Sequence, residues 1–351
     1  MGETVTAKYL LRSFSVAILL LGLVELTFQV LPASDGPYTT FDKSFPVLKF
    51  DSSKQLDGFR TAGNLAQRKT RWHINNMGWN SPYDYNTTGD KPVIAIIGNS
   101  YVEGFPVDVD KGLASSLQNK LSNNYDCYGF GYSGSKLSQY LNISRYVQHT
   151  FHPKVMIFTL VDADVIGSIA PPGQPPQYTL FFQNSPSGLT ETPIREFIPS
   201  WIKRTHGKLG LVRYFNINKQ LPFSDQGSSK SETLSPDEIA TYNKVTDYAF
   251  GRIRSENPDT TVLILLDAPR KDIYRGKILD RSLQSRTIIS GVSHKYGFHV
   301  LDLTKPMSDL YNVNHASFSF GNDYHWNNYG FAVVTDQVDK YLRTSGIVKD
   351  K

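Results

Sequence analysis

A serine follows the first strongly apolar segment of the chain at a position where chemistry is possible. Val93 to Ile97 is a continuous apolar run, and Gly98-Asn99-Ser100 follows it directly. Such a run is typical of a strand that is buried on both faces, and ligands of open α/β sheets bind beyond the carboxyl ends of such strands. Ser100 is therefore a candidate nucleophile, although a serine at such a turn also serves as a structural cap.

A nucleophilic serine needs a base, and the base needs a group that orients it. Near the C-terminus the string Asp323-Tyr324-His325-Trp326 precedes the last periodic apolar segment. Residues two apart in an extended chain project to one face, so Asp323 and His325 are expected side by side. These residue types predict a triad for acyl transfer, in which His325 moves the proton of Ser100 and Asp323 holds the imidazole.

The segments that must position these residues alternate between strands and helices. Ser235-Pro236-Asp237-Glu238 is a capping box with proline at the first helical position. The apolar patterns predict strands near 93–97, 125–128, 155–161, 262–266 and 299–303, and helices near 111–122, 136–147, 236–255, 277–294 and 328–344. The alternation predicts a five-stranded parallel, doubly wound sheet with helices on both faces, a three-layer α/β/α sandwich.

The 351 residues suit one large α/β domain with insertions, or two domains, at roughly 150 residues per domain. Residues 32–90 are rich in Pro, Asp, Asn and Gly and predict an irregular lead-in, so the α/β domain is expected to span 91–350. Residues 166–234 contain two Pro-Pro pairs and a serine-rich tract. They are too long for an ordinary connection and predict an insertion over the carboxyl edge of the sheet.

Composition excludes several classes of protein. A hydrophobic content of 40% is too high for a disordered chain. The 37 Lys and Arg residues are scattered among 32 Asp and Glu residues, so no nucleic-acid partner is expected. The single Cys127 cannot form an internal disulfide. Histidines without ligand spacing predict no metal, and the dinucleotide fingerprint at 129–134 lacks its acidic partner, so no cofactor is expected.

The N-terminal segment has the length and composition of a membrane helix. Lys8 and Arg12 lie in residues 1–12, a predicted cytoplasmic tail, and the nearly apolar stretch 13–31 follows. Positive charge on the N-terminal side predicts that residues 32 onward lie outside the cytoplasm. Because Glu25 and Gln29 shorten the uninterrupted apolar part, a cleaved signal sequence is the alternative to a retained single-pass anchor.

Three blocks of this sequence resemble the SGNH hydrolase family, also called GDSL-like esterases and lipases. Gly98-Asn99-Ser100 resembles the Gly-Asp-Ser block, and the glycine-rich segment 131–135 resembles the second block, in which Gly134 matches the oxyanion glycine. Asp323 and His325 resemble the final Asp and His of that family. The resemblance implies a three-layer, flavodoxin-like fold, the triad of Ser100, Asp323 and His325, and an oxyanion hole made by the amides of Ser100 and Gly134.

The sequence departs from this family at identifiable positions. Asn99 replaces an Asp, and the final Asp and His are two residues apart where the family has three. The family's third block supplies an oxyanion Asn, but this chain reads Val161-Asp162-Ala163-Asp164, which places Ala163 at that position. Further site candidates, to which the sequence assigns no role, are Asn99, Asp162 and Asp164 at these departures and Gly131 of the second block.

Three functions from different classes follow from these observations. The first is a membrane-anchored, extracytoplasmic serine ester hydrolase that acts on an acylated carbohydrate or a small ester. The second is an O-acetyltransferase for a cell-surface polysaccharide, working with a multi-span membrane acyltransferase. It is suggested by the Asp-x-His-Trp string, which resembles alginate acetylation proteins, although there Asp and His precede Ser. The third is a catalytically impaired binding module, which the replacement at Ala163 keeps open.

Overall fold

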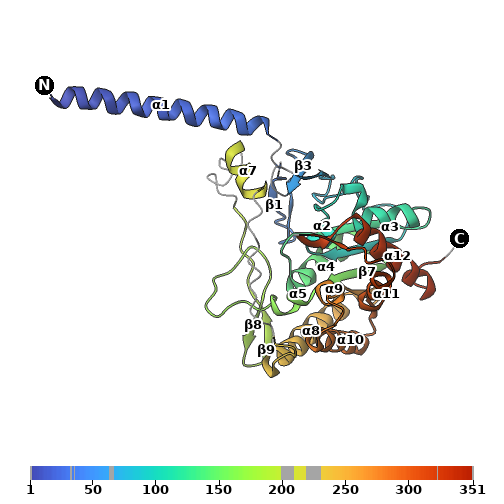
Figure 1. Cartoon of the computed structure of the whole chain (residues 1–351). Coiled ribbons are helices and arrows are strands. Elements are labelled where there is room, and N and C mark those ends of the chain that lie inside the picture. The colour runs from blue at the N-terminus through green and yellow to red at the C-terminus, as the bar shows by residue number, and fades with distance from the viewer. Residues whose placement is uncertain are drawn as a thin grey trace. The chain divides into compact units, whose positions relative to one another are not determined.

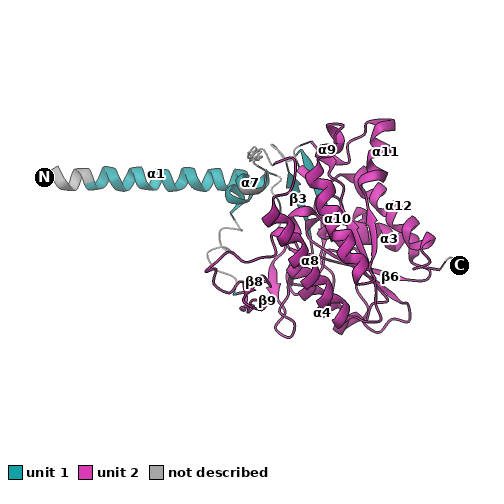
Figure 2. Ribbon diagram, turned by 90° about the horizontal axis from the view of Figure 1, so that it is seen from below, with its two compact units in different colours: residues 1–36, 58–71, 198–226 teal, residues 37–57, 72–197, 227–351 magenta. Residues whose placement is uncertain are grey.

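The computed structural model describes residues 2–31, 34, 36–62, 67–198, 209–218, 231–321 and 323–349. The chain forms two compact units, which Figure 2 distinguishes by colour. Unit 1 comprises residues 1–36, 58–71 and 198–226, and unit 2 comprises residues 37–57, 72–197 and 227–351. All candidate site residues belong to unit 2.

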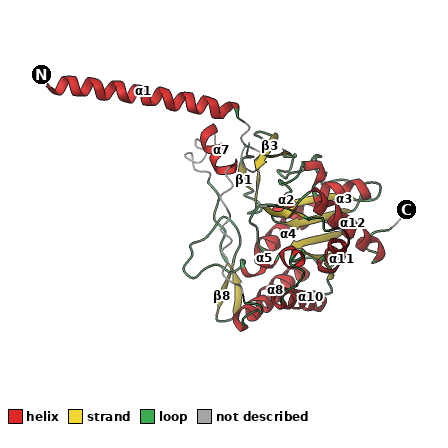
Figure 3. Cartoon of the chain, viewed as in Figure 1, coloured by secondary structure: helices red, strands yellow, loops and turns green. Residues whose placement is uncertain are grey.

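Unit 2 is built on a five-stranded parallel sheet (Figure 3). Its strands are β5 (Val93–Gly98), β6 (Asp126–Gly131), β7 (Val155–Leu160), β10 (Thr261–Leu266) and β11 (His299–Asp302). The spatial order β11-β10-β7-β5-β6 is the flavodoxin-like order, whose topological switch point lies between β5 and β7. The predicted fold class is therefore confirmed, and Ser100 follows the strand at the switch point.

The sheet contributes to two hydrophobic cores because successive side chains of a strand point to opposite faces. Ala95 and Ile97 pack into one core, and Ile94 and Ile96 into the other, all with no exposed surface. The first core includes side chains of α4 (Leu137–Phe151), α8 (Pro236–Glu256) and α10 (Asp280–Lys295), and the second includes those of α3 (Leu113–Leu121), α11 (Thr304–Asn314) and α12 (Asn328–Thr344). The helices thus cover both faces, as the sequence predicts.

Strand β6 is longer than the predicted strand 125–128 and includes two glycines. A Cβ atom on Gly129 would lie 2.9 Å from the Cβ of Ala114, and one on Gly131 would lie 2.1 Å from the backbone nitrogen of Glu103. These glycines therefore allow α3 and the short helix α2 (Ser100–Glu103) to approach the strand closely. Gly129 and Gly131 of the glycine-rich segment thus lie in the strand, and Gly134 lies in the loop that follows it.

The lead-in and the insertion contain short two-stranded sheets, of which β1–β2 and β8–β9 are antiparallel. The lead-in holds β1 (Thr39–Phe41), β2 (Leu48–Phe50), β3 (Asp57–Ala62) and β4 (Arg68–His73), and the insertion holds β8 (Phe182–Ser185) and β9 (Gly188–Glu191). The sequence predicts the insertion over the carboxyl edge of the sheet. Its hairpin instead packs on the helices α4 and α8, through the ion pair of Glu191 with Arg145 and the ring contact of Phe182 with Tyr248. Insertion residues 199–208 and 219–230 lie outside the described residues.

Unit 1 contains a long apolar helix, α1 (Gly2–Val30), labelled in Figure 1. Among the described residues, Ala7–Val30 is the segment long and apolar enough to cross a membrane, and none of it is buried within the protein. Such a helix is compatible with either an anchor or a signal sequence. The unit also contains α7 (Gly210–Asn218), which comes from the insertion.

Candidate active site

The turn after β5 presents Ser100 at the start of a helix. Asn99 is the N-cap of α2, and its side-chain oxygen accepts a hydrogen bond from the N–H of Tyr101 at 3.0 Å. Gly98 is required before this turn, because a Cβ there would lie 2.5 Å from a methyl carbon of Val102. The serine nitrogen lies in the first turn of the helix, where N–H groups have no intrahelical acceptor. Ser100 thus combines a side-chain hydroxyl with an unused backbone donor.

The short strand β13 (Asp323–Trp326) brings the base to this serine. It pairs with β12 (Ser319–Phe320), and its extended backbone places Asp323 and His325 on the same side. The Nε2 atom of His325 lies 2.7 Å from the Oγ of Ser100, and its Nδ1 atom lies 2.5 Å from Oδ1 of Asp323. Residues 225 positions apart in the sequence therefore form a continuous Ser–His–Asp hydrogen-bond chain.

The glycine-rich loop after β6 supplies a second backbone donor. Gly134 has φ +84°, a conformation that favours glycine, and a Cβ there would contact nothing within 4 Å. The N–H groups of Ser100 and Gly134 donate to no acceptor in the part of the chain that the structure describes. The loop is held to α2 by the carboxylate of Glu103, which accepts hydrogen bonds from both the N–H (3.0 Å) and the hydroxyl of Ser133.

The residues at the position of the third sequence block, Asp162, Ala163 and Asp164, lie on α5 (Asp162–Ile166), which follows β7. Ala163 is exposed and carries no hydrogen-bonding side chain. Asp162 accepts a hydrogen bond from the hydroxyl of Ser285 at 3.1 Å and lies 3.5 Å from the guanidinium of Arg286, both on α10. The carboxylate of Asp162 is thus engaged with α10, and it supplies no donor for an oxyanion.

Asp164 is fully buried and lies against the nucleophile turn. Its carboxylate accepts hydrogen bonds from the side-chain amide of Asn99 at 3.0 and 3.2 Å, from the hydroxyl of Tyr140 at 2.9 Å and from the N–H of Val161 at 3.1 Å. Burial raises the pKa of this carboxyl to about 6, and the Lys136 ammonium 3.5 Å away opposes the rise. Asn99 and Asp164, to which the sequence assigns no role, thus form a buried hydrogen-bonded pair that supports the turn carrying Ser100.

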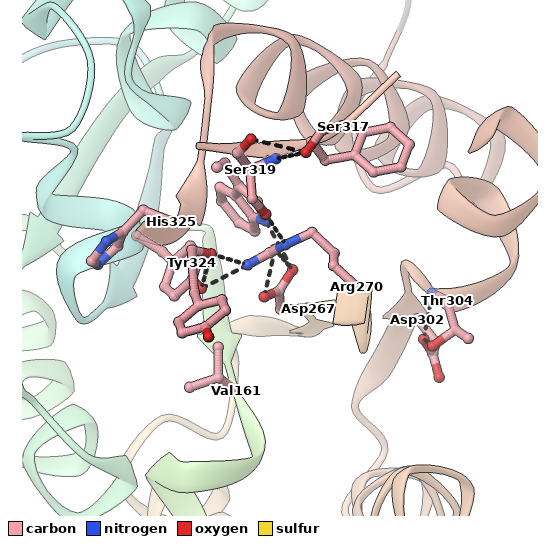
Figure 4. A network of polar contacts seen from close by, with 12 residues as sticks. Val161, Asp267, Arg270, Asp302, Thr304, Ser317, Ser319, Tyr324 and His325 are labelled. Carbon is pink, nitrogen blue, oxygen red and sulfur yellow. Dashed lines mark hydrogen bonds and ion pairs between the residues drawn. The ribbon is translucent and has the colours of Figure 1, made fainter. Parts of the chain in front are cut away.

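The sequence reasoning missed a second buried network on the other side of the triad. Asp267 directly follows β10, and Arg270 begins α9 (Arg270–Tyr274). The two side chains are 6% and 7% exposed and form an ion pair beside β13 (Figure 4). Their position in the sequence could have indicated these two residues, because both follow the predicted strand 262–266 at the carboxyl edge of the sheet, where Ser100 also lies.

The described residues include no group of three or more His, Cys, Asp or Glu side chains that could hold a metal ion. Cys127 is buried in β6, and burial raises the pKa of its thiol, so it is not a candidate nucleophile.

Comparisons with known proteins found similarity to solved structures only. No protein-family model and no curated protein matches the sequence. A lipase/acylhydrolase from Enterococcus faecalis is 12% identical over 74% of this chain and 98% of that chain, with a TM-score of 0.41. An acetyl xylan esterase is 14% identical over 72% of this chain and 100% of that chain, with a TM-score of 0.42.

A third similar structure is a carbohydrate esterase family 2 enzyme with a carbohydrate binding domain, from Corynascus thermopiles (Myceliophthora fergusii). It is 13% identical over 80% of this chain and 72% of that chain, with a TM-score of 0.41. At these identities and TM-scores the likeness defines no activity for this chain. The distances between Ser100, His325 and Asp323 bear on its chemistry directly.

Proposed function

We propose that the chain is a serine ester hydrolase of the SGNH type. The observation that carries the proposal is the hydrogen-bond chain from Ser100 Oγ to His325 Nε2 (2.7 Å) and from His325 Nδ1 to Asp323 (2.5 Å). These contacts have the roles and geometry of a nucleophile, a general base and a residue that orients the base. The assembled triad favours this function over a binding module, because binding alone does not require a nucleophile, a base and an orienting carboxylate in one hydrogen-bond chain.

The geometry suggests a two-step acyl transfer. His325 accepts the hydroxyl proton as Ser100 Oγ bonds to the ester carbonyl carbon, and Asp323 stabilises the imidazolium. The backbone N–H groups of Ser100 and Gly134 donate to the oxyanion of the tetrahedral intermediate. His325 then returns the proton to the departing alcohol. Water attacks the acyl-serine by the same route, which releases the acid and restores the Ser100 hydroxyl.

The proposed substrate is an acylated carbohydrate or a small ester. The support for an ester substrate is the triad itself, because a serine, a histidine and an aspartate in this order are the groups that acyl transfer requires. The apolar helix α1 is proposed as a single-pass anchor, with the catalytic unit outside the cytoplasm because Lys8 and Arg12 precede the apolar stretch.

The test is hydrolysis of 4-nitrophenyl acetate by the full chain in detergent, together with labelling by a fluorophosphonate. Ser100→Ala and His325→Ala should reduce kcat by about three powers of ten or more, and Ser100→Ala should abolish labelling. Matched controls on the helices are Ser116→Ala and the exposed His294→Ala, which should keep wild-type rates. Wild-type turnover by either triad variant would disprove the proposal.

The second candidate function is transfer of an acetyl group to a sugar hydroxyl. It is favoured by the Asp323-Tyr324-His325-Trp326 string. The two reactions share the acyl-serine and differ in what attacks it. Product analysis with acetyl ester and an oligosaccharide acceptor separates them: acetylated oligosaccharide indicates transfer, and acetate alone indicates hydrolysis.

A further inference from the structure

Every N–H group of the Arg270 guanidinium has an acceptor (Figure 4). Two N–H groups donate to the carboxylate of Asp267 at 2.5 and 2.7 Å, and Nε donates to the hydroxyl of Ser319 at 2.9 Å. The remaining two donate to the hydroxyl of Tyr101 at 2.7 Å and to the carbonyl of Tyr324. Because the five donors lie in one rigid plane, these partners fix the guanidinium in one orientation.

Two of these partners are neighbours of the triad in the sequence. Tyr101 follows Ser100, and Tyr324 precedes His325. The hydroxyl of Tyr101 also donates to the carbonyl of Tyr324 at 2.9 Å, so the three groups form a closed set of hydrogen bonds. The guanidinium of Arg270 therefore joins the segment that carries the nucleophile to the segment that carries the base.

The rest of the network holds the side of β13 that faces away from the nucleophile. Side chains alternate along this strand, so Trp326 projects opposite to His325. Trp326 is fully buried, and its indole N–H donates to Oδ1 of Asp267 at 2.8 Å. One side of β13 thus presents His325 and Asp323, while the other side is bound to the pair of Asp267 and Arg270.

We propose that Arg270 is a positioning residue that keeps Ser100 Oγ within hydrogen-bond distance of His325 Nε2, an inference that rests on the proposed function. A buried ion pair is weak as a source of stability, because desolvation offsets its attraction. Its hydrogen bonds are directional, however, and catalytic groups must be held to within about 0.5 Å. This need for direction explains why an arginine occupies a site that apolar side chains could fill.

The experiment compares Arg270→Lys and Tyr101→Phe with the wild-type chain on 4-nitrophenyl acetate. A displacement of about 1 Å costs up to a hundredfold in rate. We therefore expect Arg270→Lys to lower kcat at least tenfold, to change KM less than twofold and to slow fluorophosphonate labelling in parallel. Tyr101→Phe removes one oxygen and should show the same pattern with a smaller loss. The matched control is Arg145→Lys, since Arg145 is also bidentate to a carboxylate, that of Glu191.

The outcomes separate the inference from the proposed function. Wild-type kcat in both Arg270→Lys and Tyr101→Phe, with an active wild-type chain, overturns the positioning role and leaves the esterase proposal in place. A wild-type chain that neither hydrolyses nor is labelled overturns the esterase proposal itself. An equal loss of kcat in Arg145→Lys would assign the effect to general destabilisation and would also overturn the positioning role. If Arg270→Lys fails to fold, Tyr101→Phe tests the positioning role instead: a lowered kcat supports it, and a wild-type kcat overturns it.

A second, independent observation concerns the polar residues of α1. The carboxylate of Glu25 accepts hydrogen bonds from the N–H groups of Gly210 at 2.6 Å and Leu211 at 3.1 Å, at the start of α7. The side-chain oxygen of Gln29 accepts a hydrogen bond from Arg213 at 2.9 Å. These contacts satisfy N–H groups that a helix start leaves without acceptors, and they explain two polar residues in an otherwise apolar stretch.

Aromatic contacts extend this pairing within unit 1. The ring of Phe28 lies 5.0 Å from that of Tyr214 and 5.7 Å from that of Phe215, centroid to centroid. We infer that α7 docks on the C-terminal end of α1, so that the apolar helix is retained in the mature protein and is not removed as a leader. A leader has no need for side chains that cap a helix encoded some 185 residues later.

The test uses the full chain in membranes, with the substitution pair Phe28→Cys and Tyr214→Cys and mass spectrometry of the mature N-terminus. The control pair is Leu20→Cys with Tyr214→Cys, since eight residues of helix separate positions 20 and 28 by about 12 Å. We expect a disulfide in the first pair only, and its loss on adding Glu25→Leu. A mature protein that lacks residues 1–31, or equal cross-linking of both pairs, would overturn the inference.

Discussion

Replacement of Asp164 by Asn should change how the stability of the protein depends on pH. The wild-type carboxyl has a pKa of about 6 against an ordinary value of 3.8, because burial disfavours its charged form. Unfolding releases this group into water, where its pKa falls. Well below pH 3.8 the group is protonated in both states, whereas near pH 5 the folded protein holds a proton that the unfolded chain does not.

The magnitude follows from proton linkage. The raised pKa makes a contribution to stability that is fully present below the unfolded value of 3.8 and is lost as pH rises through about 6. At roughly 1.4 kcal/mol for each tenfold change in proton affinity, the loss is about 3 kcal/mol. Asp164→Asn cannot ionise, and so the free energy of unfolding of the variant minus that of the wild type should increase by about this amount from pH 4 to pH 7.

Urea unfolding followed by tryptophan fluorescence at half-unit pH intervals measures this difference. Lys136→Met is a directional check, because removal of the ammonium that lowers the pKa of Asp164 should move the loss to higher pH. A difference between Asp164→Asn and wild type that stays constant from pH 4 to pH 7 would show that the carboxyl is not raised. A difference that falls with pH would show that the ion pair with Lys136 outweighs burial.

Four further outcomes follow from the site. Ala163→Asn should speed the hydrolysis of 4-nitrophenyl acetate, by up to about a hundredfold if the missing oxyanion donor limits the rate; an unchanged turnover rate would show that the hole is complete without it. Asp323→Asn should lower kcat by up to about ten thousandfold, through loss of the correct imidazole tautomer, and less than Ser100→Ala. Gly134→Ala should cost about 1 kcal/mol, because φ is +84° there, and should lower kcat with little change in KM. A truncated protein that begins at Pro32 should fold and hydrolyse the ester, since the triad lies wholly in unit 2; an inactive, aggregated product would show that α1 is part of the catalytic fold.

The parallel sheet could be predicted because its signals are local. Strands buried on both faces read as continuous apolar runs, as at Val93–Ile97, and the capping box at Ser235 starts α8 where expected. The closing helix has the predicted bounds, Asn328–Thr344. The extended spacing of Asp323 and His325 also placed both side chains on one side of a strand, although the pairing of that strand with β12 was not predicted.

The supports of the site could not be predicted because their partners are remote in the sequence. Arg270 bonds to Tyr101, which lies 169 positions away, and Asn99 bonds to Asp164 across 65 positions. An arginine or an aspartate after a buried strand could form hydrogen bonds with many side chains, and the hydrophobic periodicity of the sequence does not indicate which one it contacts. Gly131 was similarly ambiguous, since a glycine needed for close packing looks the same in sequence as a glycine needed for a turn.

These remote contacts have a common physical logic. Three segments at the carboxyl edge of the sheet are each held by a buried polar side chain. Asp164 holds the turn at Ser100, Glu103 holds the glycine-rich loop after β6, and Arg270 holds β13. Apolar packing would hold these segments with less cost in desolvation, but it is non-directional and permits small rotations of a side chain. In the proposed reaction, a proton passes from Ser100 Oγ to His325 Nε2 along the hydrogen bond that joins them. The raised pKa of Asp164 reflects the cost of such a buried support, because burial disfavours the charged form of its carboxyl.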